Sequence, residues 1–161
     1  MTAPALHPDL AELAMLIGTW RGKGHGTYPT IERFDYVEEV TIDHVGKPFL
    51  SYAQRTRRAG DHPEAGVPLH AESGYWRPAR PGGVELVIAQ PSGIVEVDEG
   101  TIRGSIIHVT GTTIATTTTA KEVSSVERRI EVEGDVLSYE LWLGAVGQEH
   151  QLHLTATLRR E

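Results

Sequence analysis

The chain has 161 residues, a formal net charge of −7 at pH 7 and no cysteine. This length fits one domain, which we place over residues 1–161, and the acidic balance argues against nucleic acid as a partner, because phosphate backbones are bound by basic surfaces. The missing thiols exclude disulfides, iron–sulfur clusters and thiolate-bound metals. No apolar stretch is long enough to span a bilayer and no signal-peptide pattern opens the chain, so we predict a cytoplasmic protein without membrane contact.

The first predicted element is a short amphipathic helix near the N-terminus. Pro8 suits the first turn of a helix, Leu10, Leu13 and Ile17 recur at helical spacing, and Gly18 is a natural stop. We therefore expect this helix to pack one apolar side against the rest of the domain.

Beyond residue 18 the hydrophobic period changes to two, which is typical of half-buried strands. The alternating apolar positions are clearest near both ends of the remaining chain: Phe34, Tyr36, Val40, Ile42, Leu137, Tyr139, Leu141 and Leu143. Turn residues interrupt the pattern at 46–48, 58–68, 81–83, 91–93, 99–100, 133–135 and 144–147. These breaks predict about ten short antiparallel strands without crossover helices, arranged as a sandwich or a closed barrel.

A glycine-rich segment follows the helix directly. Gly18, Trp20, Gly22 and Gly24 fall at every second position and would share one face of a strand. One interpretation is a bent strand that closes a barrel, with glycines relieving crowding; the other is backbone that approaches a flat ligand, so these four residues are candidate cofactor contacts. A nucleotide-binding loop is excluded, because such loops follow a strand and precede a helix.

Eight histidines are the other candidate ligands, and none forms the paired pattern of a zinc protease. His150 and His153 are three residues apart, which places them on opposite faces of a strand, so they should not bind one metal together. Residue pattern alone selects none of the eight.

Four blocks of the chain resemble the nitrobindin family in that family's order. The glycine signature G-x-W-x-G-x-G stands at residues 18–24 and runs into the segments 28–31 and 34–39. Segments 69–78 and 87–90 resemble the next two blocks, and 152–158 resembles the last strand. The likeness extends from the first helix to the final residues.

This resemblance implies an all-β fold: a roughly ten-stranded antiparallel barrel of the fatty-acid-binding-protein and lipocalin type with a short N-terminal helix. It also implies one non-covalent haem b per chain with His153 as the axial iron ligand and the catalytic centre. The implied activity is isomerisation of peroxynitrite to nitrate at ferric haem, with reversible binding of nitric oxide. By the same alignment the remaining cofactor contacts are Leu69, His70, Gln90 and Leu143 in the haem cavity, and Thr30 and Lys121 near the porphyrin or its propionates.

One feature of the last strand conflicts with this assignment. Leu152, Leu154, Ala156 and Leu158 form one face, so the period of two turns His153 outward. A ligand-binding barrel can depart from this rule, because its lumen accepts polar groups while a second subunit or a helix covers an apolar outer face, and a homodimer would account for such a cover.

Two other functions fit the same residues. A small barrel of this kind also suits a carrier of an apolar ligand without catalysis, which would contain no iron. A weaker alternative is an acid–base enzyme using His70 and Glu72, which share a strand face but lack an accompanying nucleophile motif.

Overall fold

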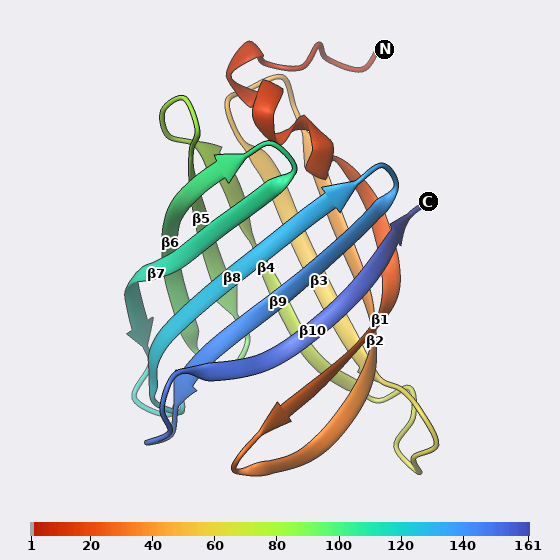
Figure 1. Ribbon diagram of the computed structural model, residues 1–161, viewed down its shortest axis with the longest axis vertical. Helices are drawn as coiled ribbons and strands as arrows, with labels where there is room; N and C mark the ends of the chain where they lie inside the picture. Colours follow the sequence, from red (N-terminus) through yellow and green to blue (C-terminus); the bar gives the residue numbers. More distant parts are fainter. Residues whose placement is uncertain (1) are drawn as a thin grey trace.

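Ten antiparallel strands close into a barrel in the computed structural model, which describes residues 2–161 (Figure 1). Each strand pairs with the next along the chain, and β1 pairs with β10 to complete the closure. The strands are β1 (Gly18–Tyr28), β2 (Ile31–His44), β3 (Leu50–Arg58), β4 (Pro68–Pro78), β5 (Gly83–Gln90), β6 (Ile94–Arg103), β7 (Ile106–Thr116), β8 (Val123–Glu133), β9 (Val136–Ala145) and β10 (Gln151–Arg160). This architecture confirms the predicted barrel. Within residues 2–161, no helix has the length and apolar character needed to cross a membrane.

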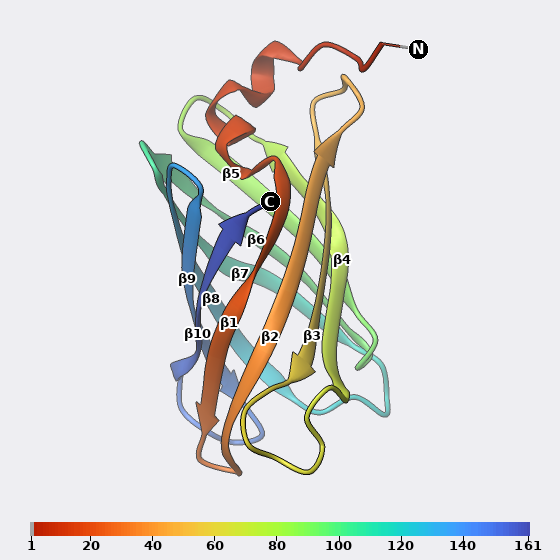
Figure 2. The same ribbon diagram turned by 90° about the vertical axis from the view of Figure 1, so that its right-hand side faces the viewer.

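The predicted helix is present as η1 (Pro8–Leu16), but it is a 3-10 helix. Its three residues per turn bring Leu10, Leu13 and Leu16 onto one buried face, whereas the expected Ile17 is only half-buried at the helix end. The helix lies across one end of the barrel, and the β1–β2 turn and the β3–β4 loop lie at the opposite end (Figure 1 and Figure 2). One end of the barrel is therefore plugged by leucines.

The plug is tied to the barrel by the seam between β1 and β10. The buried Trp20 indole donates a hydrogen bond to the Leu16 carbonyl at 2.8 Å. The Arg160 guanidinium stacks on the Trp20 ring at 4.2 Å and donates to the carbonyls of Met15 and Ile17. Hydrogen bonds from both the indole and the guanidinium therefore satisfy the carbonyls at the end of the helix.

The glycines of β1 make room where neighbouring chain segments come close. A Cβ atom at Gly22 would overlap the Thr157 carbonyl of β10, and one at Gly24 would overlap the Tyr36 ring of β2. Gly18 has a φ of +143°, in the region that favours glycine. These contacts account for the glycine pattern by strand packing inside a closed barrel.

Most of the predicted turns are where expected, with one exception. The Glu99–Gly100 pair lies within β6, which continues to Arg103 before a turn at Gly104. Gly100 was misread as a turn residue. It is glycine because the backbone of β7 lies close to it, and a Cβ atom there would overlap the His108 carbonyl of that strand.

Candidate functional site

The barrel encloses one large cavity of about 660 Å³ that runs from the helix plug toward the opposite end. This volume lies within the range of roughly 300–1,000 Å³ that is typical of small-molecule and cofactor sites. Leu16 lines its deep end, and Arg33, Arg58 and His62 line it near the open end. Most of the wall between them is apolar and includes Phe34, Val40, Ile42, Leu86, Ile94, Val126, Ile130, Leu141 and Leu154.

His153 lines this cavity, although the alternation of β10 predicted an outward position. The pairing of β10 with β9 shifts register between Leu152 and Leu154, so His153 is the extra residue of a β-bulge. The bulge turns Leu152 outward, with 41% of its surface exposed, and brings His153 inside beside Leu154. The prediction from periodicity was therefore wrong, and the inward position of His153 needs no covering subunit.

The His153 ring is held in one tautomer. Its Nδ1 lies 3.0 Å from the Thr27 carbonyl oxygen, which can only accept, so Nδ1 carries the proton and Nε2 keeps a lone pair. Tyr28 and Phe34 contact the ring edge-on at centroid distances of 5.2 and 6.3 Å. Burial lowers the pKa of His153, and protonation of His70 would lower it further, although the hydrogen bond to Thr27 opposes both. The neutral form of the ring is thus favoured at neutral pH.

The structure separates the other predicted contacts into two groups. Leu69, His70, Gln90 and Leu143 line the same cavity as His153. Thr30 and Lys121 are exposed in the β1–β2 and β7–β8 connections, at the open end of the barrel but outside the cavity lining. The glycine-motif residues Gly18, Trp20, Gly22 and Gly24 also lie outside the lining, in the β1 seam described above.

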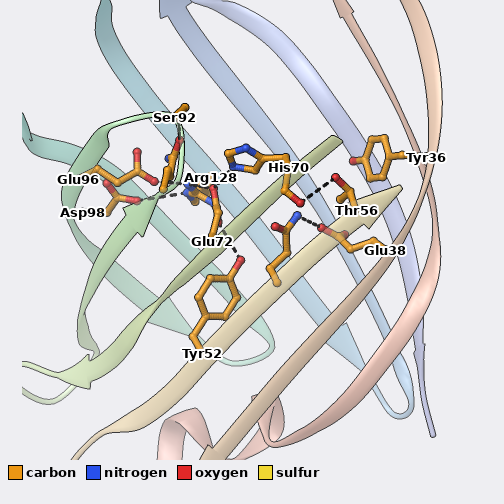
Figure 3. Close-up of polar contacts among 12 residues, drawn as sticks. Tyr36, Glu38, Tyr52, Thr56, His70, Glu72, Ser92, Glu96, Asp98 and Arg128 are labelled. Carbon is orange, nitrogen blue, oxygen red and sulfur yellow. Dashed lines mark hydrogen bonds and ion pairs between the residues drawn. The ribbon is translucent and has the colours of Figure 1, made fainter. Parts of the chain in front are cut away.

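A buried charge network crosses the inner part of the cavity (Figure 3). Arg128 of β8 donates two hydrogen bonds to Glu72 of β4, at 3.1 and 3.2 Å, and one to Glu96 of β6. Its Nε atom lies 3.3 Å from Asp98, and the Tyr52 hydroxyl donates to Glu72 at 3.0 Å. One guanidinium is thus shared by three carboxyl groups that are almost inaccessible to solvent.

Burial and the shared cation affect these carboxyl groups differently. Burial raises the pKa of Glu72, but Arg128 and His70 outweigh it and hold that pKa well below its ordinary value, so Glu72 is ionised. For Glu96 and Asp98 the effect of burial is larger than the opposing effect of Arg128, so both pKa values are raised. The network therefore contains an ionised Glu72, two carboxyl groups whose neutral forms are favoured by burial, and one cation that contacts all three.

A second polar group lies beside it and centres on Glu38 of β2. The Gln54 amide and the Tyr139 hydroxyl both donate to Glu38 Oε2, the latter at 3.1 Å, and Tyr36 and Tyr139 are joined through their hydroxyls at 2.7 Å. Burial raises the pKa of Glu38 to about 7 despite the two donated hydrogen bonds. Glu38 is therefore a carboxyl group that changes charge near neutral pH.

We expect Glu38→Gln to gain stability relative to the unmodified protein as pH rises. The folded-state pKa of about 7 lies above the ordinary value of 4.5, so the contribution of the neutral acid is fully present below 4.5 and is lost as pH rises through 7. The amide stays neutral, and its advantage should reach about 3 kcal/mol at alkaline pH. Urea unfolding followed by circular dichroism across this range measures the difference.

The matched control is Glu39→Gln, one residue away on the outer wall. The hydrogen bond and charge of Arg21 hold the pKa of Glu39 below its ordinary value, so its contribution has the opposite sign and is lost as pH falls. A pH-independent difference between Glu38→Gln and the unmodified protein would contradict the assigned burial of the acid.

Sequence reasoning named His70 and Glu72 but missed the network around them. Arg128 occupies an inward position between Val126 and Ile130 on β8, and Glu96 and Asp98 follow Ile94 at the same spacing on β6. The alternation of each strand places these charged residues on the same face as buried apolar ones, and this pattern could have indicated that they point inward. The partners across the barrel could not be inferred without the strand order.

Comparison with known proteins agrees with this geometry. Residues 9–160 match the family model described as THAP4-like, heme-binding beta-barrel domain. A protein named peroxynitrite isomerase 2 from Mycobacterium avium (strain 104) is 55% identical over 160 residues, 97% of each chain. The peroxynitrite isomerase of Nocardia farcinica is 50% identical over 161 residues, which cover 98% of this chain and 94% of that relative.

Comparison with solved structures supports the same family. A crystal structure of Rv2717c from M. tuberculosis matches with a TM-score of 0.89 and 48% sequence identity, covering 98% of this chain and 99% of that one. Both sequence and fold therefore agree over nearly the whole length. The chain belongs to the THAP4-like haem-binding β-barrel family, which confirms the resemblance to nitrobindins found in its sequence.

Proposed function

We propose that this chain binds one haem b through Nε2 of His153 and, when loaded, isomerises peroxynitrite to nitrate. The observation that carries the proposal is the His153 side chain itself: a half-buried, neutral imidazole on the wall of a largely apolar cavity, whose Nδ1–H donates to the Thr27 carbonyl and whose Nε2 is left for a metal. The names of the relatives from M. avium and N. farcinica support the activity.

The residues present fit a haem in three respects. The cavity has the size and apolar lining that a porphyrin needs, and the ligating imidazole is fixed by a backbone carbonyl. The carboxylate side chains of the porphyrin require cations or donors at an open edge, where Arg33 and Arg58 line the cavity and the exposed Thr30 and Lys121 lie at the same end of the barrel. The Arg58 Nε atom has no hydrogen-bond partner, although it lies 3.8 Å from the exposed Glu64 carboxylate.

When bound, haem supplies a ferric iron with an open coordination position for peroxynitrite or, reversibly, for nitric oxide. The chain contributes the surroundings of that position. Phe34, Leu69 and Leu143 exclude water from the cavity wall and limit the escape of reactive species. The Thr27 carbonyl keeps the His153 ring oriented and increases its basicity toward a metal.

The interior charge disfavours the alternative role as a fatty-acid carrier. Within the described residues Arg128 is the only lysine or arginine that is buried, and three carboxyl groups surround it. A fatty-acid headgroup would therefore meet carboxyl groups and no free cation deep in the cavity. We propose that the cavity does not serve as a carboxylate-lipid site.

The test combines haem titration with peroxynitrite decay. Titration with hemin should produce a Soret band at one haem per chain, whereas a fluorescent fatty acid should not bind. Stopped-flow mixing should show faster peroxynitrite decay with the loaded protein than with the haem-free protein, together with a higher nitrate yield and less nitration of added tyrosine. Unchanged decay in the presence of bound haem would remove the isomerase proposal and leave only haem binding.

A further inference from the structure

His70 lies on the wall of the cavity that faces His153. Passing around the barrel from β10 to β4 crosses β1, β2 and β3 in one direction and β9 to β5 in the other, so the two strands are on nearly opposite walls. Both histidines line the same cavity, and protonation of His70 would lower the pKa of His153. A small ligand in this cavity can therefore reach the His70 imidazole, which forms part of its lining.

The Glu72 carboxylate orients the His70 ring. His70 Nε2 lies 3.4 Å from Glu72 Oε1, which only accepts in its ionised form, so Nε2 carries the proton and Nδ1 has the free lone pair. Glu72 cannot turn away easily, because Arg128 and Tyr52 bind its two oxygens (Figure 3). His70 itself keeps 35% of its side-chain surface exposed, so the ring also reaches water.

We propose that His70 accepts the proton of a weak-acid ligand entering the cavity and then holds the resulting anion by a hydrogen bond from Nδ1, with Glu72 as the positioning residue. This inference rests on the proposed function and deepens it, because peroxynitrite in its protonated form, peroxynitrous acid, is such a ligand. Glu72 stabilises the imidazolium that forms, as a carboxylate does for a catalytic histidine.

Every proton in this step is accounted for. The O–H bond of peroxynitrous acid breaks, an N–H bond forms at His70 Nδ1, and the peroxynitrite anion remains beside the imidazolium. Nitrate is the anion of a strong acid and does not take the proton back. The exposed side of His70 returns the proton to water, which regenerates the neutral ring.

Azide provides a probe for this role, since it is also the anion of a weak acid and binds ferric haem. We expect His70→Leu in the haem-loaded ferric protein to lower azide affinity roughly ten- to hundredfold, the effect of losing a charge-assisted hydrogen bond. His25→Leu makes the same chemical change on the outer wall, where His25 contacts Thr155, and should bind azide like the unmodified protein. Equal azide affinity for His70→Leu and the unmodified protein would overturn the proposal.

A second measurement uses the haem-free protein and does not depend on loading. Nitrogen-15 NMR of the imidazole should show His70 protonated at Nε2. In Glu72→Gln the single amide oxygen is taken by Arg128 and Tyr52, so the amide nitrogen faces His70 and the proton should shift to Nδ1. Azide binding to the loaded unmodified protein should be accompanied by uptake of a proton, whereas Glu72→Gln, in which Nδ1 already carries the proton, should bind azide without proton uptake. This provides the binding test if His70→Leu does not load haem.

Failure of the proposed function and failure of the His70 role give different results. If the unmodified protein takes up no haem, the proposed function fails, while the NMR result still decides whether Glu72 orients His70. If haem binds and peroxynitrite decays faster, but His70→Leu keeps the azide affinity and Glu72→Gln keeps the proton uptake of the unmodified protein, only the role of His70 is refuted. A His70 proton found at Nδ1 in the unmodified protein refutes it as well.

Discussion

His153→Ala is expected to lower haem affinity by about a hundredfold or more, while the β-rich circular dichroism stays unchanged. The substitution removes the nitrogen that we assign to the iron, and changes to groups that merely support a ligand already cost roughly 10–100-fold. The fold should tolerate it, since the ring lies at a bulge near the open end and outside the buried apolar cluster. Hemin titration followed at the Soret band measures the loss.

Two companion variants make this result specific. His150→Ala removes a histidine of the same region whose ring contacts Ser125 and Glu127 on the outside, and it should bind haem normally. His153→Gly leaves space for free imidazole, which should restore the Soret band when added. A normal five-coordinate haem spectrum in His153→Ala would refute the assignment of the ligand.

Arg128→Met should destabilise the protein by about 3–5 kcal/mol near neutral pH, the cost of removing one partner of a buried ion pair. Methionine fills a similar volume but leaves Glu72, Glu96 and Asp98 without their cation. These groups then take up protons more readily, so the penalty should shrink as pH falls and the carboxylates become neutral. Urea unfolding at neutral and mildly acidic pH measures both effects.

The neighbouring Arg129 provides the control for this experiment. It lies on the outer wall, 3.1 Å from Glu131 and half-exposed, and an ion pair of this kind contributes roughly 0–1 kcal/mol. Arg129→Met should therefore change the free energy of unfolding little. Adding Glu96→Gln to Arg128→Met should recover part of the lost stability, and a penalty that is equal at both pH values would contradict the charge argument.

The fold was largely predictable because a barrel wall imposes a simple pattern. One side of each strand meets the interior and the other meets solvent, so the alternation in segments such as 34–42 and 137–143 follows directly. The helix was also correctly located, but its 3-10 period replaced Ile17 with Leu16 on the buried face. Helical spacing alone does not distinguish these geometries over so few residues.

The candidate site was predictable only in part. Family resemblance pointed to His153, whereas periodicity contradicted it, because a bulge leaves no clear mark in the sequence of β10. The contacts among Glu72, Arg128 and Glu96 join strands that are far apart in the chain. Such contacts depend on the order of strands around the barrel, which local patterns do not encode.

The seam between β1 and β10 also has a consequence for biosynthesis. Gly26 pairs with Leu154, so β1 finds its second neighbour only after the other eight strands have left the ribosome. During that interval β1 has a free edge, and such edges invite pairing with other nascent chains. The glycines and charged residues of β1 make it a poor template for pairing with other chains. The strand is therefore more available to pair with β10 of its own chain.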